Sequence, residues 1–393
     1  NKKDQAPEGT KDENVFDIMS GVSIAIFVRH EHHDPATCAV YHADLWGARG
    51  RYDDPAGKYA WLSENDIFST NWERLVPSAP FFYFIPWERK YQEYECFTKI
   101  TDIFNISSVG IATGRDKLTI QFSEREMRHT AETFKTYSEA EARNLYSLGK
   151  DARDWKVHLA QQDIRENSSK SEGLMRILYR PFDHRYTIYT GCSRGFHCMP
   201  RPAVMNNLAH HQNYALITSR MTKGEEFAHV HLTDTISEVI CLSPKTSNNG
   251  FVFPLYTWDH GKKQGSFFDE DDGQEKVNLD AKYIDDTVVN TGLSYHPQGT
   301  GDLETSFGPE DLFAWIYALL HAPSYRERYA AYLRRDFPRI PVPPDAALFR
   351  ALCRRGHRLI ALHLMRDHGA ALPGFPVARP QMTVETVRYR PPD

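Results

Sequence analysis

The sequence predicts an α+β fold, a mixed arrangement of helices and strands followed by a helical C-terminal segment. Three compact β-branched or aromatic runs, at 22–28, 214–219 and 251–256, have the length and composition of strands. From residue 308 onward, apolar residues instead recur at helical spacing behind helix-start signals. No internal repeat is visible, so the pattern favours one mixed domain architecture over a repeat protein.

The N-terminal third predicts strands and loops. Residues 22–28 form a run long enough for a strand buried on both faces, and 38–43 form a second run. We expect these two to pair as a hairpin at the edge of a sheet. Between 58 and 87 the density of prolines among aromatic rings favours edge strands and loops over helix.

The middle of the chain predicts more helix. Residues 97–104 fit either helix or strand, and 106–117, with two glycines and a basic end, are expected to form an exposed loop. Scattered apolar positions in polar surroundings predict three helices, at 123–129, 138–148 and 155–165. Residues 258–308 are acidic, rich in glycine and poor in apolar residues, which predicts a long and partly disordered surface excursion.

Three helices are expected in the last third. Proline and acids at 308–311 begin the first, which places Leu312, Ile316, Leu319 and Leu320 on one face. Ser324 and Glu327 have capping-box spacing and open a second helix, 325–335. Asp345 caps a third helix. Four leucines form the expected core stripe of that helix: Leu348, Leu352, Leu359 and Leu362.

Composition limits the function classes. The 393 residues are 41% hydrophobic and 25% charged, and they carry a formal charge of −5. No apolar run is long enough to span a membrane, and no signal peptide is visible. The abrupt polar start suggests a piece cut from a longer protein. Six scattered cysteines without a C-x-x-C pair suit a reducing compartment, so we expect a cytoplasmic location.

Charge is unevenly distributed. Residues 326–366 contain ten arginines and three acids, whereas 269–286 contain eight acids and two lysines. This segregation permits a basic face beside a solvated acidic loop.

Catalytic signatures are missing from the sequence. It has no N-P-P-Y or D-P-P-Y tetrad, phosphate-binding loop, G-x-S-x-G elbow or H-E-x-x-H motif. Cys192, His197, Cys198 and Cys241 fit no zinc spacing. The histidine clusters near 30–33, 210–211 and 229–231 are more simply explained by chance than by metal binding. We therefore predict no catalytic residue, no metal site and no cofactor site in this chain.

The segment 179–201 combines arginines with aromatic rings and two glycines. Its four arginines are Arg180, Arg185, Arg194 and Arg201. Guanidinium groups match phosphate oxygens and guanine edges, while rings supply stiff support. A simpler interpretation is a strand, a turn and a second strand whose arginines face water. Asp183 lies between Arg180 and Arg185, so we expect a bidentate pair that makes at least one of them structural.

Eight segments, in order along nearly the whole chain, resemble the C-terminal part of the type ISP restriction–modification enzymes, whose relatives include adenine-N6 DNA methyltransferases. They include Tyr-His-Ala-Asp-Leu-Trp-Gly at 41–47 and Gly-Phe-His-Cys-Met-Pro-Arg at 195–201. The others are 12–27, 149–156, 179–185, 245–247, 253–256, and 317–329 together with 336–341. Residues 259–305 match least.

The resemblance implies three regions. Residues 1–45 would be the last strands of a Rossmann-like methyltransferase domain, 46–307 a target recognition domain, and 308–393 its helical C-terminal segment. The family's nuclease, its helicase ATPase and its S-adenosylmethionine site would lie upstream. The parent enzyme would use S-adenosylmethionine, ATP and Mg²⁺, whereas this chain alone is expected to be inactive. Its partners would be double-stranded DNA and the upstream domains of the same polypeptide.

A recognition domain must hold phosphates and read base edges, and loops rich in Arg, Lys, Ser, Thr and Asn suit that task. The DNA-binding residues expected from these loops are Arg115, Lys117, Arg180, Arg185, Arg194, Arg201, Lys245, Thr246, Ser247 and Asn248. A different class of function also remains open. In that alternative, the Arg-rich helices at 325–366 dock an acidic protein partner.

Overall fold

The computed structural model describes most of the chain between Thr10 and Asp367. The described residues are 10–367 except 17, 19–21, 30, 32–37, 52–53, 78–81, 87–90, 153, 168–172, 224, 244, 247 and 259–273. Helices and small sheets are mixed along the chain, so the expected α+β class is confirmed. Within the described part, the helices are too short or too polar to cross a membrane.

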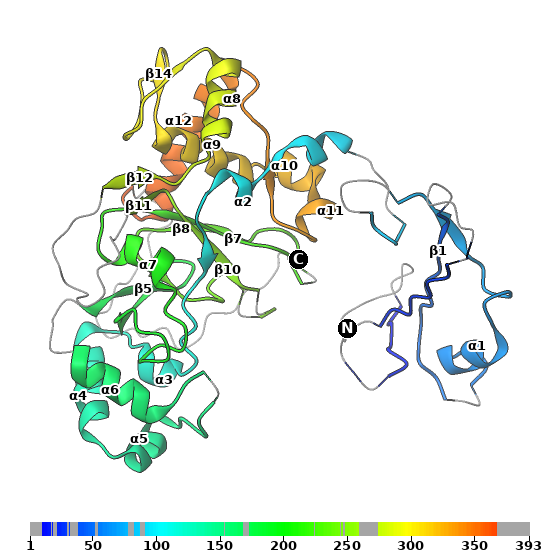
Figure 1. Cartoon of the computed structure of the whole chain (residues 1–393), viewed down its shortest axis with the longest axis horizontal. Helices are drawn as coiled ribbons and strands as arrows, with labels where there is room; N and C mark the ends of the chain where they lie inside the picture. Colours follow the sequence, from blue (N-terminus) through cyan, green and yellow to red (C-terminus); the bar gives the residue numbers. More distant parts are fainter. Residues whose placement is uncertain are drawn as a thin grey trace, which may run out of the picture.

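The N-terminal residues form a small unit that Figure 1 draws beside the main body. It contains β1 (Val40–His42), α1 (Lys58–Glu64) and β2 (Glu73–Leu75), and β1 pairs antiparallel with β2. The Lys58 ammonium lies 2.6 Å from a carboxylate oxygen of Asp12. Residues on both sides of position 45 therefore pack together.

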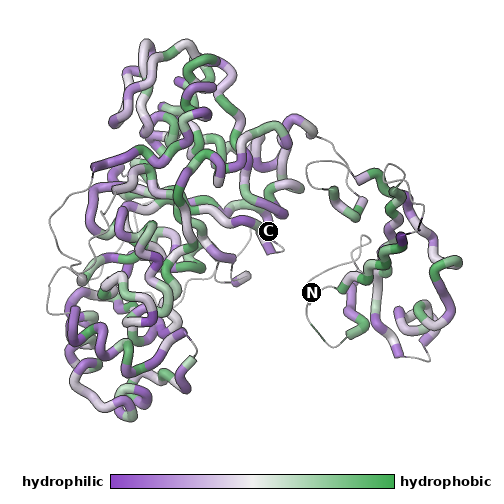
Figure 2. Tube along the Cα trace, viewed as in Figure 1, coloured by the Kyte–Doolittle hydropathy of each residue, from purple (hydrophilic) through white to green (hydrophobic). Residues whose placement is uncertain are grey.

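Two expectations for this unit are wrong. Residues 22–29 form no strand, and their apolar side chains are exposed, with Ile24 at 82% and Phe27 at 80%. The partner of β1 is therefore β2 and not residues 22–28. Residues 58–64 are helical, although the surrounding prolines had favoured strands and loops. Figure 2 shows that apolar stretches run through this unit as well as through the main body.

Two sheets organise the main body. The larger is antiparallel, in the order β4-β10-β7-β8, and Val252 lies opposite both Ser108 and Ile217. The smaller has the order β6-β5-β9, with β5 antiparallel to β6 and parallel to β9. The strands are β4 (Ser108–Val109), β5 (Leu174–Arg180), β6 (Asp183–Ile188), β7 (Ala215–Ser219), β8 (Val230–Thr233), β9 (Ile236–Ser237) and β10 (Gly250–Pro254). The expected strands at 214–219 and 251–256 are confirmed.

Three short strand pairs complete the sheets. They are β3 (Thr98–Lys99) with β15 (Arg339–Ile340), β11 (Tyr256–Trp258) with β12 (Glu275–Val277), and β13 (Ser294–Tyr295) with β14 (Ser306–Phe307). Segment 97–104 is strand and then helix, since β3 leads directly into α2.

Helices pack at both ends of these sheets (Figure 1). The remaining helices are η2 (Gln92–Cys96), α2 (Ile100–Ile103), α3 (Asp116–Thr119), α4 (Glu124–Thr136), α5 (Glu139–Tyr146), α6 (Val157–Asn167), α7 (Pro202–Ala209), α8 (Ala281–Thr291), α9 (Pro309–His321), α10 (Pro323–Arg328), α11 (Ala330–Leu333) and α12 (Ala346–His363). The three helices expected at 123–129, 138–148 and 155–165 are confirmed as α4, α5 and α6.

The core divides into three clusters. Alternate residues of the larger sheet face opposite ways, so Leu216 and Phe253 contact the C-terminal helices while Ile217 and Val252 pack toward β5 and α7. A third cluster joins α4, α5 and α6 around Trp155. This third cluster lies under the loops that carry the expected DNA-binding arginines.

The C-terminal helices confirm some of the expected start signals and correct others. The carboxylate of Asp345 accepts a hydrogen bond from the Leu348 N–H (2.8 Å), as predicted for α12. The expected capping box at Ser324 is wrong, because α10 begins at Pro323 and the helix breaks at Tyr329.

The expected core stripe of α12 is only partly correct. Leu352 and Leu359 are partly buried and pack against the first core cluster, whereas Leu348 is 44% exposed. Leu362 is partly buried. The residues that face the core are Phe349, Cys353, Gly356 and Ile360. A methyl group at Gly356 would collide with the Ala314 carbonyl, so α9 and α12 cross at close range. The most buried positions of α12 therefore lie one residue after three of the expected leucines, at 349, 353 and 360.

Residues 274–308 correct another expectation. They form α8 and the β13–β14 pair, and the side chains of Tyr283, Leu293 and Phe307 are buried in the first core cluster. Their apolar residues are few but well spaced for packing, so this stretch is an ordered part of the main body.

Candidate nucleic-acid interface

The loop that follows β6 is held from beneath by a buried carboxylate. Asp163, on α6, accepts hydrogen bonds from the Phe196 N–H (2.7 Å) and the Thr190 hydroxyl (2.8 Å). A methyl group at Gly195 would collide with the same carboxylate, so this position requires glycine. Loop 190–201 therefore has a fixed backbone path over the third core cluster.

This fixed path presents two arginines in an uncommon backbone conformation. Arg194 is exposed with φ +62°, and Arg201 is half-buried with φ +57° at the N-cap of α7. The left-handed region costs a residue other than glycine about 1–2 kcal/mol. Such a cost at two arginines of one loop is a reason to look for function there.

A second loop, 112–117, lies directly beside it. Ala112 and Met199 exchange two backbone hydrogen bonds, of 3.1 and 3.2 Å. A Cβ atom at Gly114 would lie 3.6 Å from the Cβ of Cys198, which is ordinary contact distance. The two loops are thus joined along their backbones and face the same side.

The side chains of loop 112–117 have different tasks. Asp116 accepts hydrogen bonds from the Tyr179 hydroxyl (2.7 Å) and from Thr113, which ties the loop to β5. Arg115 lies over the Trp155 ring, with 5.0 Å to its centroid, and donates to the Lys150 carbonyl (3.3 Å). Lys117 is exposed.

Two surface depressions follow the joined loops. The first has a volume of about 410 Å³ and lies between loop 112–117 and the end of α5. Its lining residues are Gly114, Arg115, Asp116, Lys117, Tyr146, Ser147, Leu148, Gly149 and Lys150. The second has a volume of about 490 Å³ and lies along loop 193–203. Its lining residues are Ser108, Asp154, Ser193, Arg194, Cys198, Met199, Pro200, Arg201, Pro202 and Ala203.

Arginines from both loops lie close enough to Cys198 to influence its thiol. Burial raises the pKa of the Cys198 thiol and Asp154 adds to this rise, whereas Arg115 and Arg201 oppose it. The two arginines therefore place positive potential at the wall between the depressions. We call the joined surface of Arg115, Lys117, Lys150, Arg194 and Arg201 the basic loop face.

Arg180 and Arg185 are held by carboxylates of their own chain. Arg185 makes a bidentate pair with Asp183, with distances of 2.8 and 3.1 Å, and packs on the Tyr179 ring (4.0 Å). Arg180 donates to a carboxylate oxygen of Glu238 at 2.7 Å. The expected pairing by Asp183 is confirmed, and both arginines join strands within the fold.

The expected loop at 245–248 is closed around an acid. Glu225 accepts hydrogen bonds from the Ser243 hydroxyl (2.9 Å) and the Thr246 hydroxyl (3.5 Å), and its carboxylate lies 3.9 Å from the Lys245 ammonium. Asn248 is 2% exposed beside His229. Ser247, which completes the predicted set, lies outside the described residues.

Several C-terminal arginines also have partners within the chain. Arg328 pairs with Glu93 (2.7 Å), and Arg366 pairs with Asp234 (3.1 Å). Arg350 and Arg354 both contact Glu304, at 2.8 and 3.5 Å. Four of the ten arginines at 326–366 thus form ion pairs with acids of the same chain, although three of these four side chains remain more than half exposed.

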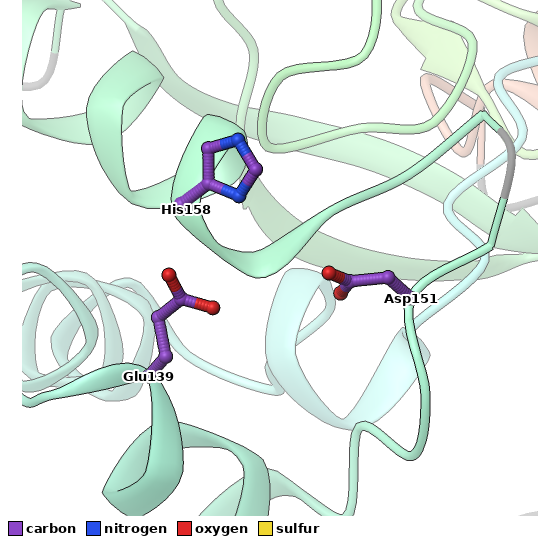
Figure 3. A group of neighbouring side chains, drawn as sticks. All are labelled: Glu139, Asp151 and His158. Atoms are coloured by element: carbon purple, nitrogen blue, oxygen red, sulfur yellow. The ribbon is translucent and has the colours of Figure 1, made fainter.

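One group of side chains has the composition of a metal site. Glu139, Asp151 and His158 are exposed, and their potential ligand atoms lie within 4.8 Å of one another. Figure 3 shows the three side chains converging between α5 and α6. Arg143 lies between the two carboxylates, 2.7 Å from Asp151 and 3.3 Å from Glu139, and supplies the compensating charge. We assign this group the structural role of joining α5 to α6.

Sequence reasoning missed several residues of the basic loop face and its frame. Lys150 and Asp154 lie in segment 149–156, whose resemblance to the family was noted without a role for either. Asp163 carried no signal, because an acid in a helix is usually solvent-exposed. Its task depends on a loop that lies about thirty residues further along the chain.

The two sheets and their packed helices form an α+β domain, and the joined loops 112–117 and 190–201 present charged residues on its surface. Residues 102–392 match the model of the Type ISP C-terminal specificity domain. The chain belongs to this family, and the resemblance recognised in the sequence is confirmed. No curated protein matches the chain.

Two solved structures share the fold. One is a DrdV–DNA complex, with a TM-score of 0.55 and 21% identity over 80% of this chain and 30% of that chain. The other is the ATP-dependent Type ISP restriction–modification enzyme LlaBIII bound to DNA. Its TM-score is 0.52 at 16% identity, over 77% of this chain and 19% of that chain. This chain thus spans less than a third of either relative.

Proposed function

We propose that this chain recognises a specific DNA sequence for a restriction–modification enzyme that methylates adenine N6 and cleaves DNA. One observation carries the proposal. Two loops joined by backbone hydrogen bonds place Arg115, Lys117, Arg194 and Arg201 around two adjacent depressions. Membership of a specificity-domain family and two DNA-bound relatives of the same fold support it.

The proposed chemistry follows from the side chains of the face. Lysine and arginine neutralise phosphates and release counterions, which supplies affinity for any duplex. Arginine also reads guanine through its planar fork of donors. The proposed DNA-contacting residues are therefore those of the basic loop face. Of the other predicted residues, Arg180 and Arg185 would join strands within the fold, and Lys245 and Thr246 would hold their own loop around Glu225. Asn248 would be a buried part of that loop.

The proposal includes the rest of the polypeptide. Residues 1–45 would continue an upstream methyltransferase domain, and 46–307 with 308–393 would form the recognition region. The contact between Asp12 and Lys58 crosses this proposed boundary, so the two parts would share a packed junction. Methyl transfer and cleavage would belong to the upstream domains, together with S-adenosylmethionine, ATP and Mg²⁺.

Salt dependence of binding tests the proposal. The complete polypeptide that carries this chain is titrated against a labelled 30-base-pair duplex at 50 and 200 mM NaCl. If six to ten phosphates are contacted, affinity should fall about 10³- to 10⁵-fold between these concentrations. Lys117→Ala, Lys150→Ala and Arg194→Ala should each lower the salt slope by about 1.

Lys282→Ala is the matched control, because Lys282 is exposed on α8 and its ammonium pairs with Asp286 on the same helix. This variant also removes one positive charge, but at a site distant from the loops, so it should leave the salt slope of DNA binding unchanged. Equal slopes in all four variants would move the binding surface elsewhere. Loss of duplex binding in Arg328→Ala or Arg354→Ala alone would instead place the DNA-binding surface on the C-terminal helices.

A further inference from the structure

The first depression offers mainly positive charge. Arg115, Lys117 and Lys150 line it, together with two glycines whose φ values are positive. Its one carboxylate, Asp116, is engaged by Thr113 and Tyr179. A site of donors and cations suits a phosphate group, which presents only acceptor oxygens and negative charge.

The second depression has mixed chemistry. Arg194 and Arg201 supply donors, two serine hydroxyls supply either role, and Asp154 adds a carboxylate. Four further lining residues are apolar: Met199, Pro200, Pro202 and Ala203. A carboxylate repels a phosphate, and apolar side chains cannot donate hydrogen bonds to its oxygens. The same set suits the edge of a base pair, which presents donors, acceptors and flat apolar surface.

The pattern fits one base pair better than the others. In the major groove, guanine offers the acceptors N7 and O6, and cytosine offers the donor N4–H₂. Arginine is the usual partner of guanine, and a carboxylate accepts from cytosine N4. We infer that the second depression reads a G·C pair, with Arg201 donating to guanine and Asp154 accepting from cytosine. This inference rests on the proposed DNA recognition and assigns the first depression to the phosphate backbone.

Arg201 is better prepared for this role than the other arginines of its segment. Arg180 and Arg185 are each held by a carboxylate, whereas the Arg201 guanidinium donates to the Met199 sulfur, 3.2 Å from Nη2. A thioether is a weak acceptor, so the guanidinium loses little when it turns to a stronger one. Its half-buried position also limits the freedom that binding must remove.

Asp154 interacts within the chain as well. A carboxylate offers about four lone-pair sites, so an existing contact does not exhaust its capacity to accept. Replacement by asparagine gives a directional result, because asparagine pairs with adenine through N6 and N7. Asp154→Asn should therefore change which base is preferred, and not only how tightly DNA binds.

The experiment is selection from a randomised duplex library by the complete polypeptide and its variants. Wild type should enrich a motif with at least one fixed G·C pair. Arg201→Ala should relax that position and weaken binding of the wild-type motif about 5- to 150-fold. Asp154→Asn should shift the same position or its neighbour toward A·T. Lys117→Ala is the matched control: it should enrich the wild-type motif at lower affinity.

The outcomes separate this inference from the proposed function. Enrichment of an unchanged motif by both Arg201→Ala and Asp154→Asn would overturn the inference while DNA recognition stands. A wild-type motif without a fixed G·C pair would do the same. Enrichment of no motif by wild type would overturn the proposed function and the inference with it. Circular dichroism of each variant checks folding, and Asp154→Asn provides the test if Arg201→Ala does not fold.

Discussion

Two loops of this protein both carry cationic and hydroxyl side chains, but they place their nearby acid differently. Loop 190–201 presents Arg194 at the surface and keeps its acid, Asp163, underneath the backbone. Loop 243–248 surrounds its acid, Glu225, with its own polar side chains. We call the first the open loop and the second the closed loop.

The difference shows what a carboxylate does in each place. Asp163 binds a main-chain N–H and a threonine hydroxyl, so it fixes the path of the open loop without engaging Arg194. Glu225 binds hydroxyls and lies near Lys245, so it engages side chains of the closed loop. In these two loops, the nearby acid thus leaves Arg194 available to a ligand and partly neutralises Lys245.

The largest effect is expected from removal of the anchor of the open loop. Asp163→Ala leaves two donors of the open loop, the Phe196 N–H and the Thr190 hydroxyl, without their acceptor, at about 1–3 kcal/mol each, and it also removes the acceptor of the Asn167 amide. The free energy of unfolding should fall by about 2–6 kcal/mol in urea denaturation. Glu166→Ala is the control, because Glu166 is exposed on the same helix and should change stability by less than about 0.5 kcal/mol. Equal, small effects would show that Asp163 does not hold the loop.

The next effect concerns DNA affinity in the two loops. Arg201→Ala and Arg194→Ala should each cost about 1–3 kcal/mol of binding if they contact a base, and should show a smaller salt slope if they contact a phosphate. Lys245→Ala and Thr246→Ala should leave affinity nearly unchanged. Asn248→Ala should lower stability, because Asn248 is buried.

The measurement is fluorescence anisotropy of a selected duplex and a scrambled duplex with each variant. A loss of affinity at Lys245 as large as that at Arg201 would contradict the distinction between the open and the closed loop. If all the alanine variants bind both duplexes like wild type while remaining folded, neither loop is the reading surface.

A smaller effect should expose the backbone strain of the open loop. Arg201→Gly and Arg201→Ala both remove the guanidinium, but only glycine adopts φ +57° without steric cost. Arg201→Gly should therefore be more stable than Arg201→Ala by about 1 kcal/mol, and neither should read its base pair. Thermal unfolding of the two variants measures the difference. A more stable alanine variant would mean that the backbone relaxes at this site.

The smallest effect is a pH dependence of the closed loop. Burial lowers the pKa of His229, and this outweighs the opposing effect of Glu225. The folded state therefore favours neutral histidine, so its contribution to stability is complete above pH 6.5 and is lost as the pH falls through the lowered value. The protection factors of the closed-loop amides, which correct for the intrinsic pH dependence of exchange, should fall on acidification from pH 7 to pH 5.5, because the opened loop protonates His229 more readily. The open loop should respond as well, since burial lowers the pKa of His197 to about 4. His229→Gln should remove the fall in the closed loop and leave the response of the open loop unchanged.

Local signals in the sequence predicted the C-terminal helices and the core strands. Proline at the start of α9 and the Asp345 cap of α12 act within one turn, so sequence alone reveals them. The buried face of α12 was missed because it depends on Gly356, where the Ala314 carbonyl approaches. Hydrophobicity favours the leucines there, but close contact favours the small residue.

Long-range partners explain the other failures. Residues 22–28 have strand composition, but a strand also needs a neighbour, and the described residues supply none to this run. Residues 274–308 looked too polar for a core, yet Tyr283 and Phe307 are buried against helices that follow later in the chain.

Features of the candidate site could be predicted where they depend on nearby residues and were missed where they depend on distant ones. Exposure of Arg194 and pairing of Arg185 with Asp183 follow from nearby residues. The burial of Asn248 beside His229 depends on a contact 19 residues away, and the position of Lys150 depends on the neighbouring loop.

The anchoring of the open loop has a consequence for how such a protein can change. Asp163 holds Phe196 through the main chain, and Ala112 holds Met199 in the same way. Neither contact requires a particular side chain at 193, 194 or 201. If these residues contact DNA as proposed, single substitutions at these positions would alter target preference while the scaffold stays intact, so new specificities would be reachable one mutation at a time. The glycine at 195 is the exception, and we expect it to persist among variants with different targets.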